Sequence, residues 1–260
     1  MLNRLSLAAD YFQGVHRMAL IKPSDASRAT RRPYLATSVG KKVLMAVTGL
    51  LLLVYLVLHL AGNLLIYFGP PTFNAYSHFL IANPLIVPVE IGLLAVFLLH
   101  VYEAVLNWLE NRRARPVSYY QPIRRLFGYG WAGKPSRKSI ASATMIGSGL
   151  IIVLFVVVHL LQFKFGADYL TTASSGAPGI RDLYRLEIEN FSNLAIVAFY
   201  VFCMVIIGFH LWHGISSALN SLGVDYRGSA PTLLRIARIG AVVIAGGFLF
   251  IPIWAFFLRG

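Results

Sequence analysis

Five long apolar blocks, separated by shorter polar segments, organise this chain of 260 residues. Each block reaches the roughly 20 residues that an α-helix needs to cross a hydrocarbon core of about 30 Å. Prolines gather in the connections, and the first four blocks have no interior proline apart from Pro88. The pattern predicts five transmembrane helices, over residues 43–68, 85–108, 140–163, 191–215 and 236–258. No internal sequence repeat is expected.

The composition agrees with an all-α membrane protein. Hydrophobic residues make up 57% of the chain and charged residues 13%, with a mean hydropathy of +0.68. A soluble domain would have about 25% charged residues. The single cysteine, Cys203, excludes an intramolecular disulfide and any iron–sulfur or zinc site built from cysteines of this chain alone.

The basic residues predict the orientation of the spans. Eight Lys and Arg precede the first block, eight lie between the second and third, and three lie between the fourth and fifth, against four on the other side. Lysine and arginine collect in cytoplasmic loops. We therefore expect a cytoplasmic N-terminus in a multi-pass protein of the inner (cytoplasmic) membrane. Topology accounts for the net charge of +13, so no nucleic-acid partner is expected.

Two parts of the chain are expected outside the spans. Residues 1–40 are mixed and basic and lack the features of a cleaved signal. We interpret them as a cytoplasmic extension, with a short interfacial helix around Leu2–Met18, that precedes a five-helix domain over 41–260. The longest outer connection, 164–190, is acidic and is interpreted as a solvated cap.

Seven histidines occur, and five of them lie inside the apolar blocks. An ionisable side chain within a membrane is costly, so each needs a structural or chemical reason to be there. The five are His59, His100, His159, His210 and His213. The other two, His16 and His78, are not expected to bind a metal.

The depths of four histidines match in pairs. At 1.5 Å per residue, His59 lies roughly 24 Å along its helix, His100 roughly 22 Å, and His159 and His210 roughly 28 Å along theirs. Because successive helices run in opposite directions, His59 and His159 fall near the outer face. His100 and His210 fall near the cytoplasmic face. Each pair comes from helices that run parallel.

Two haems with two histidine ligands each need this arrangement. Neutral imidazole binds haem iron strongly, and helical bundles commonly hold cofactors between facing helices. We therefore predict that the first four helices form a bundle around two stacked b-type haems. His59 and His159 are expected on one iron and His100 and His210 on the other. A lone intramembrane histidine is more often a hydrogen-bond partner between helices, but four at matched depths favour ligation.

The residues beside the histidines leave one choice open. His213 follows His210 by three residues and presents a similar face, about 4–5 Å nearer the headgroups. His210 is the predicted ligand, with His213 near the haem periphery or propionates. Gly62 and Gly214 are predicted to admit a porphyrin edge or to allow close helix packing. Glu103 is expected at the inner interface.

Four sequence stretches, three of which contain the histidines discussed above, resemble motifs of a known protein family. They are His59-Leu-Ala-Gly-Asn63, Phe73-Asn74-Ala-Tyr76-Ser-His78-Phe79, Asn111-Arg-Arg-Ala-Arg-Pro116-Val-Ser-Tyr119, and Phe209-His210-Leu-Trp-His213-Gly214 through Gly223. Together they resemble the cytochrome b subunit of succinate:quinone oxidoreductases, the succinate dehydrogenases and fumarate reductases that have one five-helix, two-haem anchor. The resemblance covers about residues 40–258.

The resemblance implies partners and a role. Such a subunit anchors a flavoprotein subunit, where succinate and fumarate interconvert, and an iron–sulfur subunit, and it transfers electrons through its haems to a quinone such as menaquinone. The family's four axial ligands map onto His59, His100, His159 and His210. Family members differ in how the fourth helix presents its histidine, so the choice between His210 and His213 stays open. The basic cytoplasmic surface would suit a docked iron–sulfur subunit.

The resemblance also suggests where quinone binds. An acidic residue at the outer end of the second helix serves quinone in family members, and Glu90 is the candidate here, with His78, Asn74 and Tyr76 in the same region. Reduced quinone needs such a proton-handling group within hydrogen-bond reach. Glu90 could equally be an interfacial residue that faces water. A second possible region is on the cytoplasmic side, at Arg113, Lys138 and Ser139.

Two other functions fit parts of the pattern. The cytochrome b subunit of a hydrogenase or formate dehydrogenase also binds haem, although it usually has fewer helices and another histidine distribution. A proton-coupled transporter could use intramembrane histidines and Glu90. Transporters usually have inverted repeats or helices broken near the midplane, and neither is expected in this chain.

Overall fold

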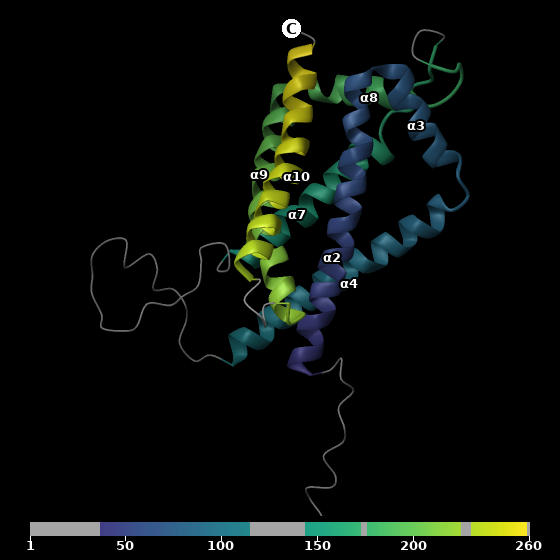
Figure 1. Ribbon diagram of the computed structural model, residues 1–260. Helices are drawn as coiled ribbons and strands as arrows, with labels where there is room; N and C mark the ends of the chain where they lie inside the picture. Colours follow the sequence, from purple (N-terminus) through teal and green to yellow (C-terminus); the bar gives the residue numbers. More distant parts are fainter. Residues whose placement is uncertain (1–36, 115–143, 173–175, 225–229, 259–260) are drawn as a thin grey trace, which may run out of the picture. The chain divides into compact units, whose positions relative to one another are not determined.

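The computed structural model describes residues 37–114, 144–172, 176–224 and 230–258. These residues are almost entirely helical (Figure 1). The helices are α2 (Ser38–Asn63), α3 (Pro70–Ala82), α4 (Ile86–Arg113), α7 (Met145–His159), α8 (Leu183–Phe191), α9 (Leu194–Ser221) and α10 (Ala230–Leu258). Two short segments extend them: the 3₁₀-helix η2 (Leu64–Phe68) after α2, and the π-helix η3 (Leu160–Lys164) after α7.

Five of these elements are long and apolar enough to cross a membrane, which confirms the predicted number of spans. They cover Ser38–Phe68, Ile86–Arg113, Met145–Lys164, Leu194–Ser221 and Pro231–Phe257. Three helices run several residues beyond their apolar blocks where charged residues continue the helix: α2 and α10 at their starts, and α4 at its end, where Arg112 and Arg113 form the last turn. The described parts of α7 and α9 begin after the predicted starts, at Met145 and Leu194. The chain is therefore a multi-pass membrane protein by the length and composition of its helices. The predicted interfacial helix near the N-terminus lies outside the described residues.

Four of the spans are neighbours in a ring. α2 packs against α4 and α9, and α7 packs against the same two helices, so α2 lies diagonal to α7 and α4 lies diagonal to α9. The fifth span, α10, packs along α9, as Figure 1 shows, and also contacts α2 and α8. The first four spans therefore form a bundle, and the fifth covers one side of it.

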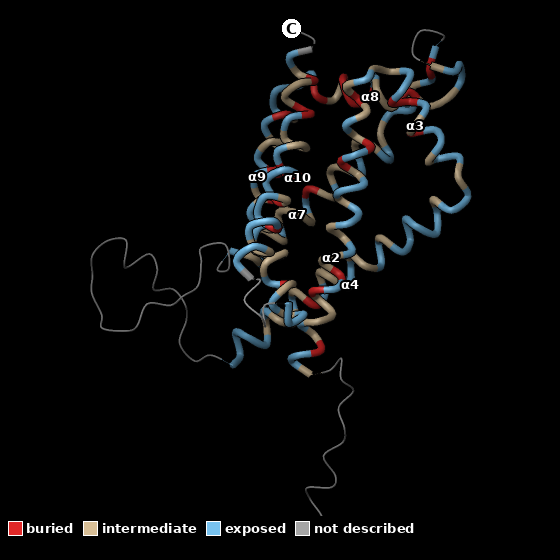
Figure 2. Tube along the Cα trace, viewed as in Figure 1, coloured by how far each residue is buried: buried red, intermediate tan, exposed pale blue. Residues whose placement is uncertain are grey.

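Two short helices, α3 and α8, join the ends of the spans and were not predicted. Pro70 and Pro71 occupy the first turn of α3, where a missing backbone N–H costs nothing. The Asp182 side chain caps α8 by accepting from the backbone N–H of Arg185 at 3.0 Å. The expectation of a purely solvated cap over 164–190 was wrong for this helix. Leu186, Ile188 and Phe191 of α8 are buried, and Figure 2 colours part of this helix as buried.

Asn74 joins these two helices. It is fully buried; its Nδ2 donates to Oδ1 of Asp182 at 2.8 Å, and its Oδ1 accepts from the backbone N–H of Tyr184 at 3.0 Å. Both ends of the amide therefore bind α8 or its cap. Phe73 of α3 and Tyr184 of α8 add a ring contact, with 6.4 Å between their centroids.

Gly166 follows the π-helix closely enough that a side chain has no space. A Cβ atom there would lie 1.9 Å from the carbonyl oxygen of Gln162. We expect Gly166→Ala to lower the free energy of unfolding by about 1–3 kcal/mol, since backbone must move to relieve the overlap. Gly147→Ala on α7 is the control, because a Cβ there meets nothing within 4 Å. Thermal unfolding of both variants in detergent checks the prediction, and equal stability of the two would contradict it.

Candidate functional site

The histidines of α2 and α7 meet across the bundle. The ring centroids of His59 and His159 lie 5.9 Å apart, and the ring planes are nearly perpendicular, at 87°. Tyr55 stacks on His59 at 5.3 Å between centroids, and Phe155 stacks on His159 at 5.6 Å. Phe248 of α10 lies 5.5 Å from His59. Aromatic rings therefore surround the pair, and the fifth span supplies one of them.

The spacing of this pair suits two imidazoles that bind one metal ion from opposite sides. Each metal–imidazole bond is about 2 Å long, so the two ring centroids would lie on the order of 6 Å apart. A haem iron takes only its two axial ligands from the protein, and neutral histidines are common in that role. The donor pair formed by His59 and His159 therefore fits a haem iron.

The histidines of α4 and α9 each contact a hydroxyl on a neighbouring helix. Thr48 Oγ1 of α2 lies 3.2 Å from Nδ1 of His100, and Ser148 Oγ of α7 lies 3.0 Å from Nδ1 of His210. His210 also interacts electrostatically with His100 and with His213. His100 therefore lies against α2 and His210 against α7, the two helices that carry His59 and His159.

These hydroxyls favour a proton on Nδ1 of each ring. Thr48 Oγ1 lies 2.9 Å from the carbonyl oxygen of Leu44 and 3.1 Å from that of Met45, and Ser148 Oγ donates to that of Met145 at 3.0 Å. A hydroxyl has one hydrogen, so once it donates to a carbonyl it can only accept from a histidine. Nδ1 of each histidine is then protonated, and Nε2 keeps its lone pair. Metal-binding histidines have this tautomer when a second group holds the other nitrogen.

His159 has a comparable partner. The Tyr200 hydroxyl donates to Oε1 of Gln162 at 2.6 Å and lies 3.5 Å from Nδ1 of His159. Tyr200 can therefore accept from Nδ1, which again leaves Nε2 with its lone pair. The hydrogen bonds link the π-helix, α9 and the histidine in one chain.

The polar partner of His59 is an amide, whereas the other three histidines each have a hydroxyl partner. Asn63 Nδ2 donates to the carbonyl oxygen of His59 at 2.8 Å and lies 3.4 Å from its Nδ1. An amide nitrogen is a donor, so this contact favours a proton on Nε2 of His59. Ligation through Nε2 requires the Asn63 amide to turn and present its oxygen.

The two halves of the site repeat at an offset of 100 residues. Thr48-Gly49 precedes His59 on α2 as Ser148-Gly149 precedes His159 on α7. Eleven residues separate each hydroxyl from the histidine of its own helix, which is roughly 16 Å along the axis. The expectation of no internal repeat was therefore wrong. Because each hydroxyl holds a histidine of the other pair, the repeat places the two pairs at two levels of the bundle.

The repeated glycines lie against the same imidazole rings. A Cβ atom at Gly49 would lie 3.2 Å from Cε1 of His100, and one at Gly149 would lie 3.8 Å from Cε1 of His210. Thr48, Ser148 and the glycine after each were not predicted as site residues. The hydroxyl–glycine pair that recurs before each histidine was the available signal.

Three of the residues suggested for quinone have other contacts. Glu90 forms an ion pair with Lys164, at the end of the π-helix, and its side chain is 44% exposed. Asn74 binds α8 through both ends of its amide, as described above. The Tyr76 ring lies over Gly62, where a Cβ would come within 2.7 Å of Cε1 of the tyrosine. Gly62 therefore leaves room for Tyr76.

The remaining suggested residues are placed as follows. His78 is exposed on α3. A Cβ at Gly214 would meet nothing within 4 Å. Arg113 ends α4, while Lys138 and Ser139, of the alternative quinone region, lie outside the described residues. Glu103 is buried at 5% exposure, and within the described chain its Oε2 has no hydrogen-bond partner.

A buried carboxyl group lies near the His59 end, on α8. Glu187 is 6% exposed, and burial raises its pKa to about 8. It interacts electrostatically with Tyr67, Tyr184 and Tyr200. The Tyr67 hydroxyl is buried without a hydrogen-bond partner among the described residues. Glu187 therefore carries its proton at neutral pH.

Comparisons of the chain with family models, with curated proteins and with solved structures find no match. The function is therefore inferred from the geometry of the four histidines and their polar partners.

Proposed function

We propose that this chain is a membrane cytochrome b that holds two haems and transfers electrons across the bundle to a quinone. The observation that carries the proposal is the contact of His59 with His159 across diagonal helices, together with a hydroxyl placed to accept from Nδ1 of His100, of His159 and of His210. His59 and His159 would hold one haem iron, and His100 and His210 the other. A single structural histidine needs no such pairing.

The side chains around the histidines fix the orientation of the imidazole rings and change their basicity. Haem would supply one-electron redox chemistry when bound, and the four histidines would hold it. Thr48, Ser148 and Tyr200 orient three of the ligand rings and increase their basicity as ligands, because each accepts the Nδ1 hydrogen. Tyr55, Phe155 and Phe248 exclude water from the His59 level and lower the local dielectric.

The resemblance of the motifs around the histidines extends the proposal to a complex. The chain would be the membrane anchor of a succinate dehydrogenase or fumarate reductase, bound to a flavoprotein subunit and an iron–sulfur subunit. Its basic end, to which Lys41, Arg112 and Arg113 belong, would face the cytoplasm and the iron–sulfur subunit. The His59 level would then be the outer one, and menaquinone or a related quinone the electron acceptor.

A reduced-minus-oxidised absorption spectrum with haem quantitation on the purified chain tests the proposal. We expect a sharp reduced α-band and two haems per chain. His210→Ala is expected to lose one haem, because Ser148 Oγ lies 3.0 Å from Nδ1 of His210 and orients this ring as a ligand, whereas His213→Ala is expected to keep both haems. Absence of haem from the wild type would refute the proposal, and equal loss in both variants would refute the assignment of His210.

Co-purification separates the proposed complex from the cytochrome b of a hydrogenase or formate dehydrogenase. We expect a flavoprotein subunit with covalently bound flavin to accompany the chain when the whole membrane complex is isolated. A nickel or molybdenum subunit in its place would support the alternative.

A further inference from the structure

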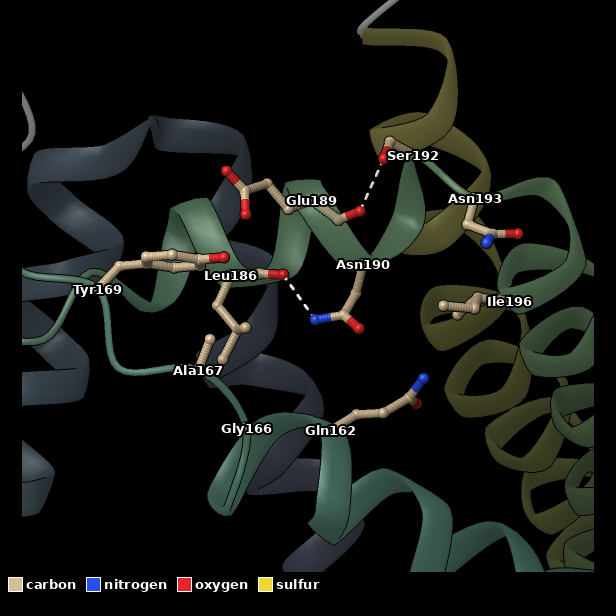
Figure 3. A pocket seen from close by; sticks show the side chains of 10 residues that line it. All are labelled: Gln162, Gly166, Ala167, Tyr169, Leu186, Glu189, Asn190, Ser192, Asn193 and Ile196. Carbon is tan, nitrogen blue, oxygen red and sulfur yellow. Dashed lines mark hydrogen bonds between the residues drawn. The ribbon is translucent and has the colours of Figure 1, made fainter.

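A pocket of about 460 Å³ lies at the His59 end of the bundle, between η3, α8 and the start of α9. Its walls include Gln162 from η3, Leu186 and Asn190 from α8, and Ile196 from α9, with Tyr169 from the segment after η3 (Figure 3). The volume falls within the range of small-molecule sites in proteins. None of the quinone residues suggested by the sequence lines it.

Two amides face one another across this pocket (Figure 3). Asn190 donates through Nδ2 to the carbonyl oxygen of Leu186 at 2.9 Å, which leaves its Oδ1 as an acceptor toward the pocket. Gln162 accepts through Oε1 from Tyr200, which leaves its Nε2 as a donor. Among the described residues neither remaining atom has a protein partner. The pocket therefore offers Nε2 of Gln162 as a donor and Oδ1 of Asn190 as an acceptor. The rest of its lining is mixed: Leu186 and Ile196 are apolar, and the other polar side chains are those of Tyr169, Glu189, Ser192 and Asn193.

The charge of the lining restricts the ligand. Among the described residues no lysine or arginine lines the pocket. Arg185 lies beside it, where its guanidinium is already engaged: its Cζ lies 4.2 Å from the centroid of the Tyr169 ring, and its Nε donates to the Glu189 carboxylate at 2.8 Å. A dicarboxylate or a lipid phosphate needs cationic partners that this lining lacks. A neutral, flat ligand with an oxygen at each end satisfies the lining better: a carbonyl oxygen accepts from Gln162, and a hydroxyl donates to Asn190.

The pocket also connects to the histidine pair. Gln162 forms part of its wall and accepts from Tyr200, which lies 3.5 Å from Nδ1 of His159. A ligand bound to Gln162 is thus two hydrogen bonds from a proposed haem ligand. The Glu90 region has no comparable link among the described contacts, because Glu90 pairs with Lys164.

We propose that this pocket binds the headgroup of the quinone, with Gln162 and Asn190 on its two oxygens. The proposal rests on the electron-transfer function proposed above and places its substrate between the third and fourth spans instead of beside Glu90. Ile196 and Leu186 contact the ring, and the pocket lies at the end of the spans, where a lipid-soluble quinone reaches it from the bilayer.

Equilibrium dialysis of labelled 2-methyl-1,4-naphthoquinone against the purified, haem-loaded chain tests the proposal. Ala167 lines the pocket and is exposed, so Ala167→Trp fills the pocket without disturbing the core. The control is Ala75→Trp, an equally exposed alanine between Asn74 and Tyr76. We expect the dissociation constant to rise at least about tenfold in Ala167→Trp, which corresponds to about 1.4 kcal/mol, and to change by less than about twofold in the control.

Other outcomes overturn the proposal. They are unchanged binding in Ala167→Trp, equal weakening in both variants, and no binding by the wild type. Photolabelling of the wild type with an azido derivative of the same quinone gives a second measurement, with label expected on residues 162–196 and not on 74–90. Haem is quantified in the same samples. A haem-loaded chain that fails these tests refutes only the pocket, whereas quinone binding without haem refutes the electron-transfer function.

Discussion

His159→Ala is expected to remove one of two haems and to leave the other in place. His159 and His59 face each other with centroids 5.9 Å apart, so loss of either imidazole leaves one iron without an axial ligand. The other level lies roughly 16 Å away along α2 and α7 and is held by Thr48 and Ser148. The haem content should therefore fall from two per chain to one, and His59→Ala should have the same effect.

The reduced α-bands of His59→Ala and His159→Ala should also have the same shape. His59→Ala and His159→Ala are expected to lose the same component of the reduced α-band, whereas His100→Ala and His210→Ala lose the other component. His78→Ala is the control, because His78 is exposed on α3 and is expected to leave both haems bound. A loss of different components in His59→Ala and His159→Ala would show that these two histidines do not share an iron.

Glu187→Gln is expected to change how stability depends on pH. Burial raises the pKa of Glu187 from 4.5 to about 8 in the folded chain, so the folded state holds this proton more tightly than the unfolded state. The free energy of unfolding is then highest below about pH 4.5 and falls as the pH rises to about 8. The fall is on the order of a few kcal/mol and disappears when the carboxyl is replaced by an amide.

Thermal unfolding of the detergent-solubilised protein between pH 5 and 8 checks this prediction. The variant should gain stability relative to the wild type as the pH rises. Glu189→Gln is a matched control on the same helix, because the Glu189 carboxylate is 29% exposed and pairs with Arg185. This control is expected to keep the wild-type pH dependence. A parallel response of Glu187→Gln and wild type across the range would refute a buried, protonated Glu187.

The spans and the depths of the histidines followed from the sequence because both depend on distance along a single helix. A helix rises by a fixed amount per residue, so the position of His100 in its apolar block determines its level without knowledge of the neighbouring helices. The short helices α3 and α8 lie in polar segments with no long periodic pattern, and their stability comes from tertiary contacts such as that of Asn74 with Asp182. These helices were therefore not predicted.

The partners of the histidines were beyond the sequence for a different reason. Thr48 and His100 are 52 residues apart, and Ser148 and His210 are 62 apart, so only the packing of α2 on α4 and of α7 on α9 brings each pair together. The sequence contained the repeat that relates the two contacts. A match of Thr with Ser among apolar residues carries little information until both hydroxyls are found at an imidazole.

The sequence by itself determined that this chain has five spans and that four histidines lie at two depths, because the hydrophobic effect and helix geometry act locally. Only the tertiary structure decided that α2 and α7 face each other diagonally and that three hydroxyls meet Nδ1 of a histidine. It also decided that a polar pocket forms beside Gln162. These features depend on side-chain packing between helices that are distant in the chain. The periodicity of apolar residues does not predict which hydroxyl will contact which imidazole ring.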